Sequence, residues 1–433
     1  MLLYRNAGLR FAAVLLASVF ILIAQKESRA DGLTKNPDFT AELRTIIEIN
    51  KPGYLNIALD PVTGENHLLV SSFQVFGKDQ LFSISRWNQG LSAPLMLKTS
   101  ILSSSTTWPN EARSAEPDLF NEPGLLIAGG FLVPGKSTGG ISFIPWTPPH
   151  TPYELTTSKR GWFYHRTETW DVNEDGHLDI ITARAYKPVI GEHKGELLWL
   201  ENPGHLNGKW TEHLIGNGPD VHFRILAPTN RRPLTIISSE FSAKKLSAYQ
   251  IDSKGSVQYI VLDDTLGSAF DVQIDDLNGD GQEDLLVSNH ESDSKASVFG
   301  YEIDFDSLII KARHTLITGI ETKQKAIKAA SPGPVTTFFP NTSSISSAQK
   351  PWILVSGDGS QKAHILVPED NFDQQKWSYR EHTLWNPKST VGQSAVGDID
   401  GDGKVEIFVP AYDSNQVAVF TIQAHQTNHI LHR

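Results

Sequence analysis

The sequence predicts an all-β protein, a seven-bladed β-propeller built from four-stranded antiparallel blades. Two observations carry this prediction. A short apolar strand followed by a polar turn recurs about every 50–60 residues, and little helical periodicity occurs anywhere. In addition, an acidic ten-residue formula occurs three times, each copy beside short apolar runs. A repeat of this length is typical of propellers, in which each repeat supplies one small sheet.

The recurring strand sets the order of the predicted blades. One marker residue, usually aromatic, lies at or near its end in each of seven copies: Trp87, Trp146, Trp199, Tyr249, Tyr301, Val367 and Phe420. We expect the aromatic markers to pack between blades, because large rings contribute strongly to a core. A further, outer strand follows five of them, at Leu95 to Thr99, Trp210 to Ile215, Val257 to Leu262, Ala312 to Ile317 and Trp377 to Leu384.

The seventh blade needs an outer strand as well. Leu43 to Ile49 has the required pattern and precedes the first blade, so its pairing with the last blade would close the ring and remove an open strand edge. Thr427 to Leu431 could supply the same strand from the other end of the chain. We expect the N-terminal strand to close the ring.

The acidic formula reads DVNEDGHLDI from Asp171, DLNGDGQEDL from Asp276 and DIDGDGKVEI from Asp398. Oxygen-bearing side chains occupy positions 1, 3, 5 and 9, Gly occupies position 6, and position 7 can offer a backbone carbonyl. This oxygen-rich spacing predicts calcium, since no thiol or imidazole fills a side-chain ligand position. The expected ligands are Asp171, Asn173, Asp175 and Asp179; Asp276, Asn278, Asp280 and Asp284; Asp398, Asp400, Asp402 and Glu406; with the carbonyls of His177, Gln282 and Lys404.

These loops differ from EF-hands. An EF-hand requires a bidentate Glu at position 12 and a helix on each side. Position 12 here is Thr182, Val287 or Val409, and short runs rich in β-branched residues flank the loops. The sequence therefore predicts three calcium loops on β-hairpins, on the third, fifth and seventh blades.

An apolar strand, the motif D-x-[DN]-x-D-G-x-x-[DE] and a second apolar strand together resemble the FG-GAP/VCBS repeats of integrin α-chain propellers and of many secreted proteins. The resemblance is clearest over residues 165–215, 268–303 and 391–422. It implies a calcium-stabilised propeller that acts outside the cell as a binding or scaffold module.

The first thirty residues predict an export signal. Arg5 and Arg10 precede an apolar stretch from Phe11 to Ala24, and small residues stand at Ser28 and Ala30. We expect cleavage after Ala30, which leaves one propeller domain over residues 31–433, secreted to the extracellular space or to a bacterial periplasm. Retention of this segment as a membrane anchor, giving an adhesion module, is the alternative.

The composition of the chain limits the classes of partner that we expect it to bind. The formal net charge is −11 and the chain contains no Cys. An acidic surface argues against nucleic acid and against anionic membranes. We expect a monomer that binds an extracellular protein or glycan. Asn341 begins an N-x-[ST] sequon, a candidate glycosylation site.

Polar and aromatic residues should gather on the face opposite the acidic loops. The residues placed there by the predicted strand order are Trp162, His165, Arg166, His222, Arg224, Asn289, His290, Glu291, Asp358, Tyr412 and Asp413. His165, His222 and His290 are weak candidates for catalysis, because a histidine can act as acid, base or metal ligand near neutral pH. Relatives with this repeat include carbohydrate lyases and dehydratases, which implies an enzyme as the alternative. The sequence contains no fixed-spacing catalytic motif, so a binding module is favoured.

Overall fold

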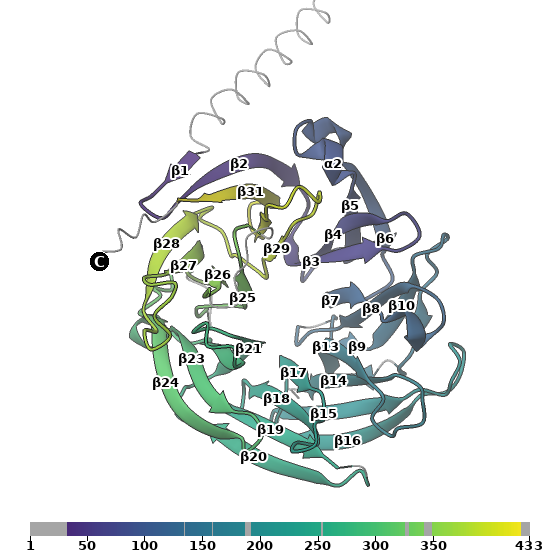
Figure 1. The fold of residues 1–433 in the computed structure, drawn as a ribbon. Helices are drawn as coiled ribbons and strands as arrows, with labels where there is room; N and C mark the ends of the chain where they lie inside the picture. Colours follow the sequence, from purple (N-terminus) through teal and green to yellow (C-terminus); the bar gives the residue numbers. More distant parts are fainter. Residues whose placement is uncertain are drawn as a thin grey trace, which may run out of the picture.

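The computed structural model describes residues 33–133, 135–157, 159–186, 192–252, 254–324, 329–341 and 349–425. These residues form seven antiparallel sheets arranged as blades around one axis (Figure 1). The predicted fold class is confirmed. The predicted signal segment and the alternative closing strand at Thr427 to Leu431 lie outside the described residues. No helix in the described ranges has both the length and the apolar character needed to cross a membrane.

The first three blades follow the chain in order. Blade 1 contains β3 (Pro52–Asp60), β4 (Glu65–Ser72), β5 (Gln80–Ser85) and β6 (Lys98–Ser103). Blade 2 contains β7 (Pro109–Ser114), β8 (Gly124–Gly129), β10 (Ile141–Pro145) and β11 (Tyr153–Glu154). Blade 3 contains β13 (Trp162–Trp170), β14 (Asp179–Tyr186), β15 (Lys194–Glu201) and β16 (Thr211–Asn217). Between blades 2 and 3, β9 (Thr138–Gly139) pairs with β12 (Lys159–Arg160).

The other four blades have the same order. Blade 4 contains β17 (Phe223–Leu226), β18 (Leu234–Glu240), β19 (Lys245–Ile251) and β20 (Val257–Asp263). Blade 5 contains β21 (Ala269–Asp275), β22 (Asp284–Asn289), β23 (Ser297–Asp304) and β24 (Ile309–Thr318). Blade 6 contains β25 (Val335–Phe338), β26 (Trp352–Ser356), β27 (Ala363–Pro368) and β28 (Tyr379–Trp385). Blade 7 contains β29 (Ala395–Gly397), β30 (Glu406–Ala411), β31 (Gln416–Ala424) and β2 (Phe39–Glu48), with β1 (Leu33–Lys35) outside β2.

Helical structure in the described residues is limited to single turns. These are α2 (Trp87–Gly90) and the 3-10 turns η1 (Pro94–Met96), η2 (Pro117–Leu119) and η3 (Asp293–Lys295). The first strands of successive blades contact one another around the axis, from β3 through β7, β13, β17, β21 and β25 to β29 and back to β3. The first strand of every blade therefore lies innermost and lines the channel at the centre of the ring.

The N-terminal strand closes the ring. β2 runs antiparallel to β31, with Phe39 opposite Ala424 at one end and Glu48 opposite Gln416 at the other. The predicted closure by Leu43 to Ile49 is confirmed, and the strand begins earlier than expected. Just before β2, Asp38 forms ion pairs of 2.8 Å with Arg380 and 2.6 Å with His382, both on β28. The start of the chain is thus held by blade 6 as well as by blade 7.

Apolar side chains fill the spaces between neighbouring blades. Trp87 is 2% exposed and meets Phe408 of blade 7 edge to face, at 5.1 Å between ring centroids. Tyr249 packs with Ile181 of blade 3, and Phe420 packs with Leu354 of blade 6. The expectation that the aromatic markers pack between blades is confirmed for these three. Because each blade shares its core with both neighbours, the ring is stabilised as one body.

Two outer strands differ from the prediction, and proline explains both. The outer strand of blade 1 begins at Lys98 instead of Leu95, because Pro94 starts the turn η1 and cannot donate to a sheet ladder. The sequence predicted no outer strand for blade 2. The structure supplies β11, of only two residues, after a segment containing Pro148, Pro149 and Pro152.

Candidate functional site

The three acidic loops connect the first and second strands of blades 3, 5 and 7, from β13 to β14, from β21 to β22 and from β29 to β30. Their sixth residues have left-handed backbone conformations, with φ of 88° at Gly176, 83° at Gly281 and 86° at Gly403. A Cβ added at Gly176 or Gly281 would meet no atom within 4 Å. Glycine is therefore required there for its backbone conformation, as the spacing predicted.

The first residue of each loop is held by backbone amides. Asp276 accepts hydrogen bonds from the amides of Gly279 and Asp280 on Oδ1, and from Gly281 on Oδ2, at 2.7–3.1 Å. Asp398 accepts all three corresponding amides, and Asp171 accepts those of Asp175 and Gly176. The turn is therefore the same in all three copies, and it orients the first carboxylate before any cation binds.

The ninth residue of each loop is buried. Asp179, Asp284 and Glu406 are at most 1% exposed, and each accepts the amide of the second loop residue at 3.0–3.2 Å. Burial, reinforced by the neighbouring loop carboxylates, raises the pKa of Asp179 to about 6 and the pKa values of Asp284 and Glu406 to about 8. The loops thus crowd carboxyl groups where water is excluded, and a divalent cation would stabilise their charged forms.

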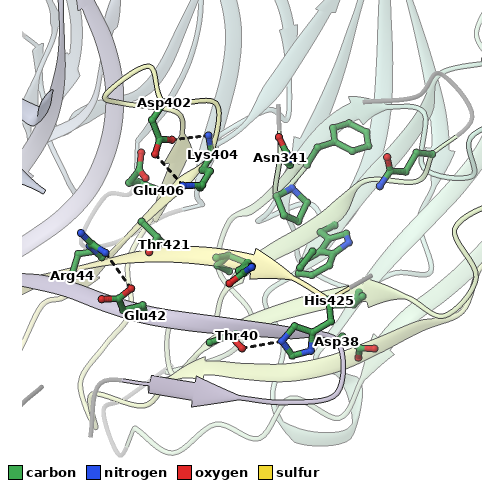
Figure 2. Close-up of a pocket in the computed structure, with 18 of the residues that line it drawn as sticks. Asp38, Thr40, Glu42, Arg44, Asn341, Asp402, Lys404, Glu406, Thr421 and His425 are labelled. Carbon is green, nitrogen blue, oxygen red and sulfur yellow. Dashed lines mark hydrogen bonds and ion pairs between the residues drawn. The ribbon is translucent and has the colours of Figure 1, made fainter. Parts of the chain in front are cut away.

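The loop of blade 7 brings three carboxylates closest together. Ligand atoms of Asp398, Asp400 and Glu406 all lie within 4.8 Å of one another, a separation that one metal ion can span. Figure 2 shows this loop at the edge of a groove of about 1420 Å³, opposite Glu42 and Arg44 of β2. The seventh residues His177, Gln282 and Lys404 have exposed side chains, which suits a role through their backbone carbonyls. The Lys404 ammonium lies 3.4 Å from Asp402.

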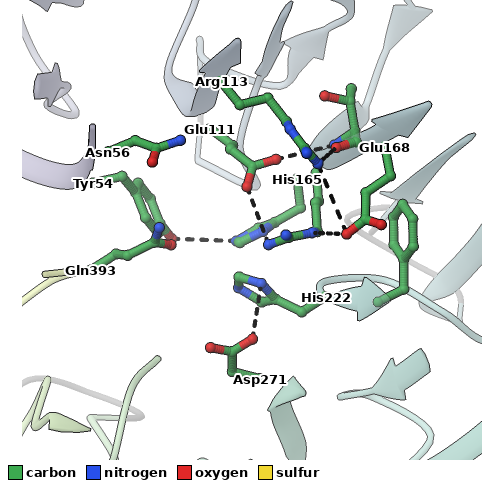
Figure 3. Close-up of polar contacts among 12 residues, drawn as sticks. Tyr54, Asn56, Glu111, Arg113, His165, Glu168, His222, Asp271 and Gln393 are labelled. Carbon is green, nitrogen blue, oxygen red and sulfur yellow. Dashed lines mark hydrogen bonds and ion pairs between the residues drawn. The ribbon is translucent and has the colours of Figure 1, made fainter. Parts of the chain in front are cut away.

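The opposite face carries the other predicted residues, and several of them come together at the central channel. The channel forms a cavity of about 350 Å³ lined by the inner strands of all seven blades. Its polar wall contains Glu111, Arg113, Arg166, His222, Arg224, Asp271 and Gln273. Figure 3 shows Glu111, Arg113, His222 and Asp271 of this wall converging from different blades.

Arginines and carboxylates pair across the blades. Arg166 of blade 3 lies 3.2 Å from Glu111 of blade 2 and 3.1 Å from Glu168. Glu168 also pairs with Arg224 of blade 4 at 3.2 Å and with Arg113 of blade 2 at 3.9 Å. Burial removes water from these groups, so mutual pairing is what keeps them charged. The network links three blades, and the charge of Asp271 on blade 5 offsets the excess of three arginines over two glutamates.

Two of the predicted histidines meet beside this network. His165 and His222 are 4% and 2% exposed, and their rings lie 4.7 Å apart. The Tyr54 hydroxyl is 3.3 Å from His165 Nε2, and Asp271 Oδ1 is 3.4 Å from His222 Nδ1. Burial lowers the pKa of both histidines, and the nearby Arg166 lowers both further. Burial raises the pKa of Tyr54. The pair is therefore neutral at neutral pH, and Tyr54 keeps its proton.

The third predicted histidine does not join the pair. His290 forms a 2.8 Å ion pair with Asp358 of blade 6, and the Phe270 ring lies between His290 and His222, at 5.2 and 5.5 Å between centroids. Among the described residues, the three histidines form no group close enough to share a metal ion.

Other predicted residues of this face support its loops. Trp162 stacks on Tyr186 and under the Arg184 guanidinium. Asn289 bonds to the backbone of Leu266, Lys295 and Ser297, and Glu291 accepts both the amide and the hydroxyl of Ser268. Tyr412 donates to the carbonyl of Phe73, and Asp413 accepts from Thr390. The polar groups of Asn289, Glu291 and Asp413 are therefore engaged in hydrogen bonds within the protein.

Five residues in or beside the channel were not predicted from the sequence: Tyr54, Glu111, Arg113, Glu168 and Asp271. Their signal is an alternation of polar residues with a spacing of two on the inner strands, as in Glu111 and Arg113 or Arg166 and Glu168. Alternate residues of a strand face the same side. In a propeller, that side of the innermost strand faces the channel.

Comparisons with known proteins reach only a short part of the chain. No family model matches it. A segment of 55 residues is 34% identical to aldos-2-ulose dehydratase of Phanerodontia chrysosporium. That segment covers 12% of this chain and 6% of the dehydratase.

Proposed function

We propose that this protein is a secreted, calcium-binding propeller that acts as a binding module for a protein or a glycan. The observation that carries the calcium part is the threefold repetition of one preorganised loop. Each copy has its first carboxylate fixed by backbone amides, its ninth carboxylate buried, and a left-handed glycine between them. Hard oxygen ligands in a tight turn suit calcium.

The binding surface in this proposal is the face opposite the calcium loops. His222 and Gln393 of the channel lie at the starts of their inner strands, toward that face, whereas the loops join the first and second strands on the other face. Calcium bound at the loops would stabilise three blades without occupying the ligand surface. The ions would then act on ligand binding through the rigidity of the ring.

A glycan array and a set of immobilised extracellular proteins, probed with the full chain, test the proposal. We expect selective binding in millimolar calcium and weaker binding after chelation. A chain that binds calcium but no ligand would overturn the assignment as a binding module. Ligand binding by a chain that binds no calcium would overturn the role of the loops.

A carbohydrate lyase or dehydratase is the second candidate, because the protonated Tyr54 contacts the unprotonated His165 at 3.3 Å, and the unprotonated His222 packs on His165. In an elimination, His222 would accept a proton from a sugar carbon, a C=C bond would form, and the C–O bond would break. Tyr54 would donate its proton to the departing oxygen. The short similarity to a dehydratase agrees with this chemistry.

Turnover distinguishes this candidate from simple binding. Incubation with neutral sugars, followed by NMR, would reveal the alkene protons of an unsaturated product. Tyr54→Phe should abolish product formation while the sugar still binds, since the phenyl ring keeps its packing against Phe73 and His165. Release of product at the same rate by Tyr54→Phe would exclude Tyr54 as the acid.

A further inference from the structure

The channel contains buried polar atoms that the protein does not satisfy. His222 Nε2 and His165 Nδ1 have no hydrogen-bond partner among the described residues, and His222 Nδ1 lies 3.4 Å from Asp271 Oδ1 without forming a hydrogen bond. Leaving a buried donor or acceptor unpaired costs about 1–3 kcal/mol. His222 lines the cavity of about 350 Å³, and its ring nitrogens are buried at the cavity wall, so a ligand in this space would be the group able to pair with them.

The charges of the channel select against an ionic ligand. Three arginines, Arg113, Arg166 and Arg224, face three carboxylates, Glu111, Glu168 and Asp271. Glu111 and Glu168 are paired with arginines, Asp271 accepts the amide of Val335, and His222 and His165 are neutral. A charged guest would have to break one of these pairs, whereas hydroxyl groups can donate to histidine nitrogens and carboxylates and accept from arginines.

Aromatic rings surround the histidine pair on this face. Phe73 stacks on Trp108 at 4.5 Å, and Trp108 stacks on Phe131 at 4.9 Å. Tyr54 contacts both Phe73 and His165, and Phe270 contacts His222. Phe131, Phe270 and Tyr54 are only partly buried. Apolar ring surface beside hydroxyl-binding groups suits a molecule with an apolar face and a polar rim, as a sugar ring has.

The shape of the channel fixes how such a molecule would enter. Inner strands of seven blades surround the cavity on every side, so a ligand can approach only along the axis (Figure 1). A linear glycan could not lie across the site. It would have to insert one terminal ring.

We propose that the channel mouth binds the terminal ring of a neutral glycan, with His222 and His165 as hydrogen-bonding partners of its hydroxyl groups. This inference rests on the proposed binding function and names its ligand class and binding mode. The ring nitrogens left unpaired in the protein are then paired by the ligand.

Calorimetric titration with neutral methyl glycosides and neutral oligosaccharides tests the inference. His222→Leu removes both nitrogens and keeps an apolar side chain of similar bulk. We expect at least a tenfold loss of affinity with no loss of thermal stability, because the variant also removes an unsatisfied polar group. His314→Leu is the matched control. It removes another unpaired ring nitrogen, on the outer strand β24, and should leave affinity unchanged.

Charged analogues and blocked chain ends complete the test. A uronic acid and an amino sugar should bind at least tenfold more weakly than their neutral counterpart, and an oligosaccharide blocked at both ends should not bind. Failure of every neutral sugar to bind the unaltered protein overturns the inference. So does sugar binding that His222→Leu leaves intact. Either result is compatible with calcium-dependent binding of a protein ligand. Such binding would support the proposed function even though the glycan site would be excluded.

Discussion

The two channel histidines are single residues whose surroundings set their protonation. Burial holds the pKa of His165 well below its usual range, and His222 and Arg166 lower it further. Unfolding returns such a side chain to water, where its pKa is about 6.5. The unfolded protein therefore binds a proton below that pH while the folded protein does not, and stability falls as the pH falls.

His165→Gln should reduce this pH dependence. Below pH 6.5 we expect this residue to reduce the free energy of unfolding of the unaltered protein by up to about 1.4 kcal/mol per pH unit, because the unfolded state binds one more proton than the folded state. The range from pH 7.5 to 5.5 covers this change. Urea denaturation gives the unfolding midpoint of the protein and of the variant across that pH range. The difference between the two midpoints isolates the contribution of His165. His213→Gln, at a half-exposed histidine paired with Glu201, is the control. Equal pH profiles for the protein and the His165 variant would contradict the prediction.

One calcium ligand can also be tested alone. Asp280→Ala removes the fifth-position carboxylate of the blade 5 loop, and calorimetric titration should find two bound calcium ions instead of three. Glu283→Ala is the matched control, because this exposed acid is in the same loop but outside the expected ligand set. We expect it to retain three ions. Three ions in both variants would exclude Asp280 as a ligand.

The strands are the elements that decide whether the ring closes. Removal of residues 31–50 should expose the edge of β31, which then has no partner, and the truncated chain should aggregate. Size-exclusion chromatography with light scattering measures this outcome. Asp38→Ala is a milder test that removes the ion pairs to Arg380 and His382 and leaves β2 in place. It should lower stability by about 1 kcal/mol or less and keep the monomer. A truncated chain that remains monomeric with an unchanged melt would contradict the role of β2.

Local patterns made most elements predictable. The acidic loops could be placed because the ligand spacing and the turn glycine lie within ten residues. The closing strand could be placed because the last blade lacked a clear outer strand of its own. The channel network could not be predicted, since Glu111, Arg166, Glu168 and Arg224 meet only after three blades pack around the axis. The strand β11 was missed because its two residues carry too little pattern to recognise.

On the scale of the whole molecule, calcium should contribute a large share of stability. Extracellular sites of this class bind calcium with dissociation constants on the order of 0.1–1 mM. At roughly ten times that concentration each occupied site adds about 1.4 kcal/mol, so three sites add about 4 kcal/mol. Chelation should lower the melting temperature, measured by circular dichroism, and leave the β-sheet signal intact at room temperature. Identical melts with and without chelator would contradict calcium binding by the loops.

The pairing of β2 with β31 has a consequence for the synthesis of this protein. The Thr40 side chain bonds to His425, a residue 385 positions later in the chain. At about 5–20 residues per second, a ribosome needs roughly 20–80 seconds to produce that partner. During this interval β2 lacks its partner β31, and the blades already made form an incomplete arc with an exposed edge. Synthesis of β31 therefore ends the period in which the edge of β2 is most exposed to aggregation.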